Sequence, residues 1–262
     1  MMNGMQAEKR LAFLYSLAAV FSTISIVSLV IAWQHWAWTL DSCIDVDCEC
    51  ILYGVNTFST FMGGDVKLCH FGTYAVVPAV FFGLILGVYH GYRSCIGRNL
   101  DGPRVSLMQI LSGSYCVGNF GRIVVVVPKR RSPCKQWMAA AFLAAFITCL
   151  SLAHAVVLTD GYYKTCEQYK RNLIHLLGSR GREVQVIYGR LSCGAILDFM
   201  DYLQPDANNW RRGDEINTGV SLQLAITTSW LNFFTFFVIS VINFLMARER
   251  HQGLGEKLCC CC

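Results

Sequence analysis

Four long stretches without a charged residue dominate the pattern of hydrophobic and polar positions along the chain. They cover residues 11–33, 71–92, 136–159 and 216–247. An α-helix rises about 1.5 Å per residue, so roughly 20 apolar residues cross a hydrocarbon layer about 30 Å thick. Because each stretch is long enough, the pattern predicts an all-α membrane protein built as a bundle of four transmembrane helices.

A fifth apolar stretch, residues 105–127, is interrupted by polar side chains. It contains Gln109, Asn119 and Arg122, and an arginine in mid-span costs about 2.5–3.5 kcal/mol even on the mildest scale. We therefore expect it to lie in the cytoplasm against the membrane surface, with a re-entrant segment as the alternative. The first apolar stretch is too long for a signal-peptide core and has no cleavage site before Trp33, so it is interpreted as a signal anchor.

Composition and charge add an orientation to this pattern. Of the 262 residues, 54% are hydrophobic and only 15% are charged, which is too apolar for an ordinary soluble domain. Cytoplasmic segments carry an excess of lysine and arginine. Residues 93–135 contain eight basic residues and one acidic residue, whereas 34–70 has a net charge of −4 and 160–215 is balanced. The basic segment and both termini are therefore expected to be cytoplasmic.

This orientation predicts the following order along the chain. A cytoplasmic N-terminus (1–10) precedes the first helix (11–33), extracellular loop 1 (34–70), the second helix (71–92), a basic cytoplasmic segment (93–135), the third helix (136–159), extracellular loop 2 (160–215), the fourth helix (216–247) and a cysteine-rich cytoplasmic tail (248–262).

The fourteen cysteines divide between the two sides of the membrane. The outer loops hold Cys43, Cys48, Cys50, Cys69, Cys166 and Cys193. Disulfides persist on that side, and six thiols allow 15 pairings, which the sequence leaves open for the first loop. Cys166 and Cys193 are the favoured pair because they are alone in the second loop. A metal site in the segment CIDVDCEC is the alternative for the first loop, and the oxidising surroundings make it the less favoured one.

A run of four cysteines, Cys259, Cys260, Cys261 and Cys262, ends the chain about a dozen residues after the last predicted helix. Cytoplasmic cysteines near a membrane are targets of reversible S-palmitoylation, and Cys95 beside the second helix is another candidate. Each buried acyl methylene contributes about 0.8 kcal/mol of membrane affinity. Prenylation is the alternative, but its motif requires aliphatic residues where this chain has two cysteines.

Small residues recur at every fourth position of the second helix. They are Ala75, Ala79, Gly83, Gly87 and Gly91. In a bilayer, helices associate through close backbone approach at small residues, so this stripe predicts a packing ridge. Its partner is either another helix of the chain or a second protomer.

Few polar side chains lie within the predicted spans, and the candidates are His154, Gln223, Asn232 and Asn243. Polar residues inside a membrane mark transport paths or join helices by hydrogen bonds. We favour hydrogen bonding because the spans contain no acidic residue and no chain of ionisable groups.

The sequence lacks the motifs of common enzyme classes, such as HExxH, GxSxG and the phosphate-binding loop. We therefore expect no catalytic activity, no cofactor and no metal. The basic segment PKRRSPCK is too short to indicate nucleic-acid binding and fits an anionic lipid surface.

Several short motifs are shared with a known family. They are Cys50-Ile51-Leu52-Tyr53, Cys69-His70-Phe71, Tyr89-His90-Gly91-Tyr92-Arg93, Thr165-Cys166-Glu167 and Ser229-Trp230-Leu231. On these motifs the chain resembles the transmembrane protein 179 family, and in general layout it is similar to claudins and tetraspanins. The resemblance implies a membrane protein without assigned catalysis.

Two functions follow as expectations. The first is a membrane organiser or accessory protein of the plasma membrane or a vesicle membrane, whose partners are the lipid bilayer and other membrane proteins or a second copy. The alternative is a subunit of a pore or transporter, because the acidic first loop would concentrate cations and the fourth helix carries polar residues.

Overall fold

The computed structural model describes residues 4–40, 47–57, 61–100, 134–178, 180–203 and 216–259. Its helices are α1 (Gly4–Leu40), α2 (Val66–Tyr74), α3 (Val77–Leu100), α4 (Cys134–Leu177), α5 (Arg182–Arg190), α6 (Cys193–Leu203) and α7 (Thr218–Cys259). A hairpin of two short strands, β1 (Cys50–Asn56) and β2 (Phe61–Gly64), lies between α1 and α2. The described chain is thus mostly helical, with one hairpin that the sequence analysis did not predict.

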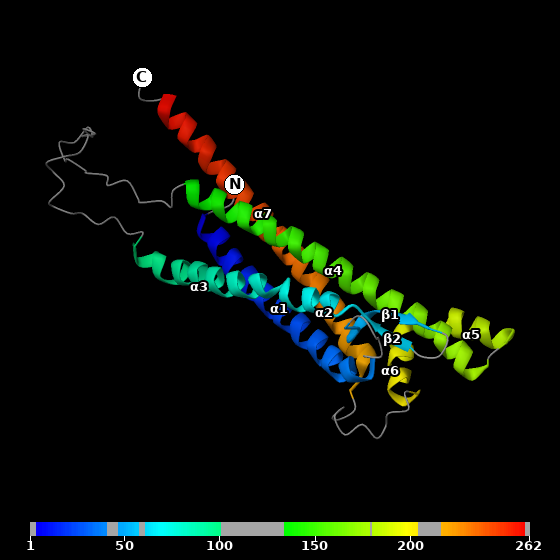
Figure 1. Ribbon diagram of the computed structural model, residues 1–262. Coiled ribbons are helices and arrows are strands. Elements are labelled where there is room, and N and C mark those ends of the chain that lie inside the picture. The colour runs from blue at the N-terminus through cyan, green and yellow to red at the C-terminus, as the bar shows by residue number, and fades with distance from the viewer. Residues whose placement is uncertain are drawn as a thin grey trace, which may run out of the picture.

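Four helical segments of the described chain are long and apolar enough to cross a membrane, the number predicted from the sequence. They are Gln6–Ala37, Val66–Cys95, Trp137–Leu177 and Thr218–Glu249. Figure 1 shows both marked ends of the chain at one end of the molecule, and β1, β2, α5 and α6 at the other. We call the latter end the head: the hairpin, α2, α5, α6 and the adjoining ends of α1, α4 and α7. Most of the predicted cytoplasmic segment, residues 101–133, lies outside the described residues, and this part includes residues 105–127.

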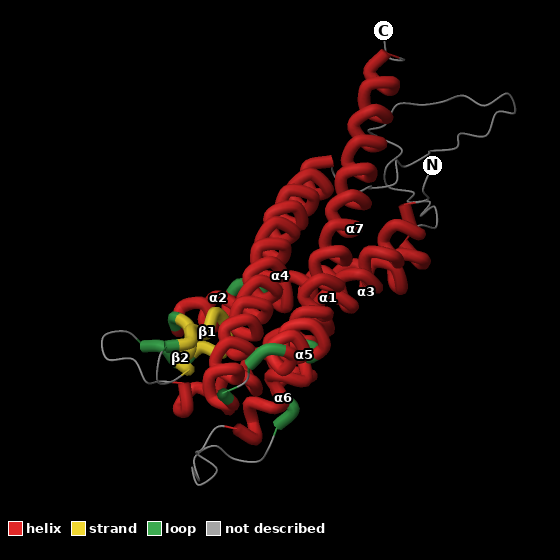
Figure 2. The backbone as a smooth tube through the Cα atoms, turned by 90° about the vertical axis from the view of Figure 1, so that its right-hand side faces the viewer, coloured by secondary structure: helices red, strands yellow, loops and turns green. Residues whose placement is uncertain are grey.

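The helices extend well beyond the spans expected from the sequence. The 44 residues of α4 correspond to about 66 Å at 1.5 Å per residue, roughly twice the thickness of a hydrocarbon layer. The first part of the expected second loop, residues 160–177, is therefore a helical continuation of α4 into the head. The view in Figure 2, turned by 90°, shows α5 and α6 packed around this end of α4.

The second span is broken into α2 and α3 because of a proline. Pro78 has no backbone N–H, so the carbonyl of Tyr74 loses the donor that a continuous helix would supply. The last helical bond of α2 runs from the N–H of Ala75 to the carbonyl of Phe71 at 2.9 Å. At the other end, the Asp65 side chain accepts the N–H of Lys67 at 2.9 Å and caps α2.

The small-residue stripe of the second span packs on α1 of the same chain. A Cβ atom added at Gly83 would lie 3.1 Å from both the Ala19 Cβ and the Tyr15 carbonyl oxygen, and one at Gly87 would lie 3.1 Å from the Ser16 hydroxyl. Ala79 is also buried, whereas Ala75 is half-buried. A Cβ atom at Gly91 would have no neighbour within 4 Å. The close approach to α1 thus spans the middle of the stripe and ends before Gly91.

Two apolar clusters fill the bundle, one in the head and one near the chain ends. The head cluster includes Trp36, Ile51, Leu158, Tyr169, Leu197 and Leu222. The second cluster draws on all four spans and includes Leu11, Tyr15, Ala79, Trp137, Ile147, Phe236 and Ile239. Along each of α1, α4 and α7, the buried side chains between the two clusters are largely polar.

Candidate functional site

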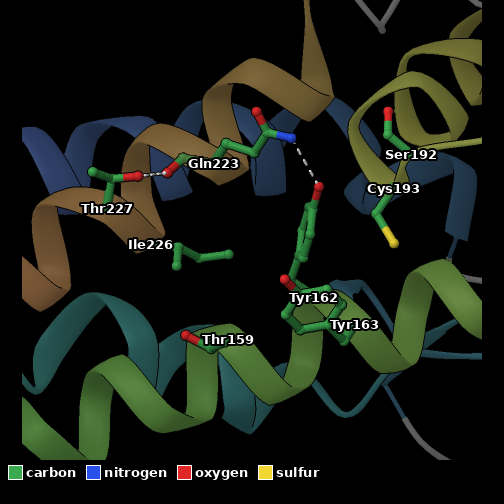
Figure 3. A pocket seen from close by; sticks show the side chains of 8 residues that line it. All are labelled: Thr159, Tyr162, Tyr163, Ser192, Cys193, Gln223, Ile226 and Thr227. Carbon is green, nitrogen blue, oxygen red and sulfur yellow. Dashed lines mark hydrogen bonds between the residues drawn. The ribbon is translucent and has the colours of Figure 1, made fainter.

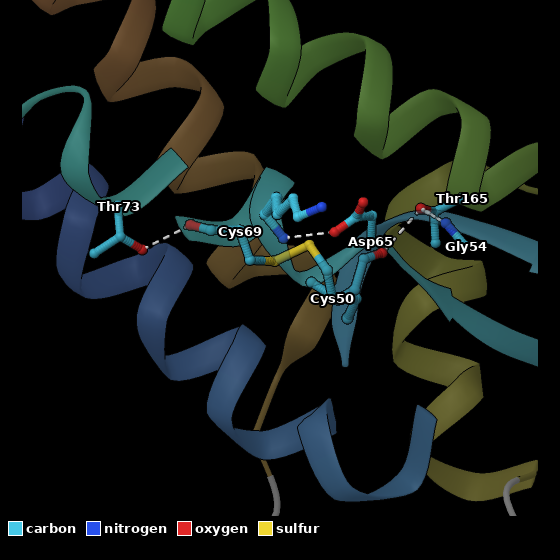
Figure 4. The surroundings of a disulfide bond; sticks show 8 residues. Cys50, Gly54, Asp65, Cys69, Thr73 and Thr165 are labelled. Carbon is cyan, nitrogen blue, oxygen red and sulfur yellow. Dashed lines mark hydrogen bonds between the residues drawn. A yellow bond between two sulfur atoms is a disulfide. The ribbon is translucent and has the colours of Figure 1, made fainter. Parts of the chain in front are cut away.

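Two disulfides between described residues hold the head together. Cys50 of β1 is bonded to Cys69 of α2, and Cys166 of α4 is bonded to Cys193 at the start of α6. The second bond joins the pair favoured from the sequence. Figure 4 shows the first bond at the point where the hairpin meets α2.

The structure also bears on the metal alternative for the first loop. Cys48 and Cys50 of CIDVDCEC are both disulfide-bonded, so neither is a thiolate that could bind a metal. No group of three or more His, Cys, Asp or Glu in the described part of the chain is arranged to hold a metal ion. Cys43 lies outside the described residues.

The hairpin is anchored to α4 by polar contacts. The Thr165 hydroxyl donates to the Ile51 carbonyl at 2.9 Å and accepts the N–H of Gly54 at 3.0 Å (Figure 4). One hydroxyl therefore binds two backbone groups of β1. Strand pairing with β2 is irregular between Cys50 and Val55, and this single side chain satisfies backbone groups that a regular ladder would have used.

Tyr53 makes the second contact between the hairpin and α4. Its backbone has a φ of 60°, and its ring covers Gly161, where an added Cβ would lie 2.8 Å from a ring carbon. The Tyr53 hydroxyl donates to Asp160 at 2.8 Å, and Asp160 pairs with Lys164 at 3.0 Å. Burial raises the pKa of the Tyr53 hydroxyl to about 12, and the Asp160 carboxylate adds to the shift.

The end of α4 and helix α5 form a helical hairpin that projects from the head (Figure 1). Its turn contains Gly178 and Gly181, with φ of 59° and 64°, a left-handed conformation that glycine adopts without strain. Five large apolar side chains on it are between 36% and 61% exposed: Leu176, Leu177, Val186, Tyr188 and Leu191. We call these five residues the α4–α5 tip.

The α4–α5 tip is surrounded by more positive than negative charge. Residues 167–191 contain five basic residues and two acidic ones, a net charge of +3. The basic residues are Lys170, Arg171, Arg180, Arg182 and Arg190. Glu167 is paired with Arg171, which leaves most of the positive charge uncompensated within this segment. Leu177 lies 18 residues beyond Thr159, the last residue of the uncharged stretch of α4, which is about 27 Å along the helix.

A layer of small polar side chains lies inside the bundle between the two apolar clusters. It consists of Ser22 and Ser25 of α1, Ser151 and His154 of α4, and Ser229 and Asn232 of α7, all at most 1% exposed. We call it the polar layer. Asn232 donates to the Ser151 hydroxyl at 3.3 Å, and Ser25 donates to the Ala225 carbonyl at 3.0 Å. These bonds link α7 to both α4 and α1, as expected for interhelical hydrogen bonding.

The polar layer also contains atoms without a hydrogen-bond partner among the described residues. They are the Ser22 hydroxyl, the Asn232 Oδ1 and the His154 Nδ1. The His154 Nε2 lies 2.8 Å from the Gly72 carbonyl. Because a carbonyl only accepts, this nitrogen carries the proton, and in the neutral ring Nδ1 is an unused acceptor.

The remaining two predicted polar residues lie at opposite ends of the bundle. Asn243 donates to the Tyr15 hydroxyl at 3.3 Å, near the chain ends, whereas Gln223 donates to the Tyr162 hydroxyl at 3.1 Å, next to the head. The serines of the polar layer were not predicted from the sequence. A signal was present, because Ser22, Ser25 and Ser28 recur every third residue and so lie near one another on α1.

Two free cysteines are exposed in the described residues, Cys95 and Cys149. Cys95, a lipidation candidate, is the last residue of the second span. Cys259 is the last residue of α7, but its side chain and residues Cys260 to Cys262 lie outside what the structure describes. Acylation of the tail therefore stays a prediction.

Comparisons of the chain with protein-family profiles, with curated proteins and with solved structures found no match.

Proposed function

We propose that this chain is a non-catalytic membrane organiser or accessory protein that binds a protein partner through the α4–α5 tip. The observation that carries the proposal is a set of large apolar side chains that are exposed on a helical hairpin. Along α4, this hairpin begins about one membrane thickness beyond the uncharged stretch of the helix. Apolar side chains grouped on a water-facing surface mark interaction sites.

The disulfides and the contacts of the hairpin support this reading. A binding surface loses less conformational entropy when its scaffold is already ordered. Cys166, eleven residues before Leu177 on the same helix, ties α4 to α6, and Thr165 ties α4 to β1. The tip is thus presented by a cross-linked scaffold. Its positive surroundings favour a partner with acidic residues around an apolar centre.

Purification in mild detergent tests the proposal. We expect a stoichiometric protein partner or a homo-oligomer that is lost on introducing Leu177→Asp and Tyr188→Asp together. The matched control is Val55→Asp, because Val55 of β1 is 52% exposed on a different element of the head. A strictly monomeric wild-type protein, or a complex that survives the tip variant and dissociates with the control, would contradict the proposal.

The polar layer favours a second candidate, a subunit of a pore or transporter. Polar atoms without partners in the middle of a membrane bundle are costly unless they serve a path for water or solute. Ion-flux recording after reconstitution in liposomes separates the two functions. A transport role requires flux that changes with Asn232→Leu, and Asn243→Leu tests whether the path continues to the chain ends. Absence of flux would remove this candidate.

We also propose that the protein is S-acylated, at the terminal cysteines and at Cys95, in the plasma membrane or a vesicle membrane. Cys95 is supported by being free and exposed at the end of a span. Labelling with an alkyne fatty acid should mark the protein, and hydroxylamine should remove the label because thioesters are labile to it. Replacing the four terminal cysteines by serine should remove most of the label and leave only the label attached to Cys95. A hydroxylamine-resistant label would indicate prenylation instead.

A further inference from the structure

A pocket of about 400 Å³ opens between α4, α7 and the start of α6. Its lining residues are Thr159, Tyr162 and Tyr163 of α4, Gln223, Ile226 and Thr227 of α7, Ser192 before α6 and Cys193 (Figure 3). None of these side chains carries a charge at neutral pH. The volume is in the range of sites that bind small molecules or headgroups.

The depth of the pocket follows from the charges on α4. Residues 136–159 of this helix are uncharged, and Asp160 is the first charged residue after Lys135. Thr159 therefore lies where the apolar span ends, at the depth of lipid headgroups. Asp160 itself is occupied, because it binds Tyr53 at 2.8 Å and Lys164 at 3.0 Å.

The pocket offers both donors and acceptors of hydrogen bonds. Figure 3 shows Gln223 donating to the Tyr162 hydroxyl. Within the described part of the chain, the O–H of Tyr162 can therefore still donate and the Gln223 Oε1 can still accept. The Tyr163 hydroxyl has no hydrogen-bond partner among the described residues, and that side chain is 60% exposed. A ligand with several hydroxyls matches this mixture, since each hydroxyl both donates and accepts.

An apolar surface continues from the pocket toward the middle of the span. Trp230 donates its indole N–H at 3.0 Å to Thr159, which lines the pocket. Phe234 and Phe237 follow on α7 and are 56% and 52% exposed. Thr227, Trp230, Phe234 and Phe237 are spaced by three or four residues, which places them on one face of the helix. An acyl chain lying on these rings would extend directly from a headgroup in the pocket.

We propose that this pocket binds the uncharged sugar headgroup of a glycolipid in the leaflet next to the head, with the lipid chains on Trp230, Phe234 and Phe237. A phosphate headgroup fits less well. It would bring a charge into a site whose lining has none, at a high desolvation cost, and Lys164, one residue beyond Tyr163, is already paired with Asp160. The tyrosine rings provide faces for the apolar side of a sugar ring.

The experiment uses the full chain in phosphatidylcholine nanodiscs that contain either glucosylceramide or a ceramide with the same chains and no sugar. Native mass spectrometry counts the lipid molecules retained per protein. We expect one glucosylceramide to be retained, with a preference over ceramide of about tenfold, the factor that one or two net hydrogen bonds supply. Equal retention of the two lipids, or preferred retention of phosphatidylserine, would overturn the proposal.

Two variants locate the site, and a third serves as the control. Gln223→Leu and Tyr163→Phe should each reduce the preference for glucosylceramide several-fold. Tyr74→Phe removes an exposed tyrosine hydroxyl from α2 and should leave the preference unchanged. If Gln223→Leu does not fold, Tyr163→Phe still tests whether the pocket is the binding site. The exposed hydroxyl that this substitution removes makes no hydrogen bond within the described residues, so the variant should fold. Methyl glucoside separates the two sources of the sugar: binding of this soluble compound as tightly as glucosylceramide would overturn the lipid assignment.

Discussion

Trp36 near the end of α1 donates its indole N–H to the hydroxyl of Thr218, the first residue of α7, at 2.8 Å. Both side chains are fully buried, so the bond joins two segments 182 residues apart in the interior of the head. At the next residue of α7, Asp198 of α6 accepts the N–H of Gly219 at 2.8 Å. The start of α7 is thus fixed by α1 and α6 together. The negative charge of Asp198 is also favourable at this position, because a helix N-terminus carries a partial positive charge.

Trp36→Phe should lower the free energy of unfolding by about 1 kcal/mol or more, because it removes a buried hydrogen bond. Thermal unfolding in detergent measures the change. Trp33→Phe is the matched control on the same helix, since the buried indole N–H of Trp33 has no partner among the described residues, and removing an unsatisfied donor should cost less. Equal losses for the two variants would show that the bond to Thr218 contributes nothing.

The contact between α1 and α3 predicts opposite effects for one substitution at two positions of the stripe. Gly83→Ala should destabilise the protein by about 1–3 kcal/mol, the usual cost of overpacking, because its Cβ would lie 3.1 Å from two atoms of α1. Gly91→Ala, where a Cβ would have no neighbour within 4 Å, should be neutral or stabilising by up to about 1 kcal/mol. Thermal unfolding in detergent gives both values, and the reverse order would contradict the helix packing.

Peptide mapping without reduction should recover Cys50 linked to Cys69 and Cys166 linked to Cys193. Replacing Cys166 and Cys193 together by serine should lower the free energy of unfolding by about 2–4 kcal/mol, the usual contribution of such a cross-link. If Cys166 and Cys193 are found as free thiols, both the head and its expected extracellular location are wrong.

The hydroxyl of Tyr53 should titrate later than an ordinary tyrosine. Because burial and Asp160 raise its pKa in the folded protein from 10.0 to about 12, the folded state favours the protonated form. Its stabilising contribution is therefore complete below pH 10 and is lost as the pH rises toward 12. The difference between the ultraviolet titrations of the wild type and Tyr53→Phe isolates this group. A midpoint near pH 10 in the difference curve would contradict the contact with Asp160.

The number of spans could be predicted from the sequence because uncharged stretches of sufficient length have few other stable locations. The pairing of Cys166 with Cys193 could be predicted because no other cysteine competes in that segment. The hairpin could not, because its polar contacts with α4 come from Asp160 and Thr165, which are 107 and 114 residues away from Tyr53 and Ile51. The break at Pro78 was not predicted, although this proline stands inside the single helix expected over residues 71–92. The extension of α4 into the head depends on packing against β1 and α6.

The polar candidates show a similar division. Asn232 and His154 were identified from their position inside apolar stretches, and both lie in the polar layer. Which helix each one contacts depends on how the spans pack, and a single sequence carries no record of that. The α4–α5 tip was not identified either, because exposed leucines in a predicted loop look the same as leucines that fold into a core.

The central claim is that the α4–α5 tip binds a protein, and a photo-crosslinking amino acid placed at Leu177 tests it most directly. Irradiation of membranes carrying the full chain should give a discrete crosslinked band containing a second protein or a second copy of the chain. The same photo-crosslinking amino acid in place of Phe146, which is 65% exposed in the middle of a span, should crosslink to lipid only. Crosslinking at Leu177 to lipid alone, or to no molecule at all, would contradict the account.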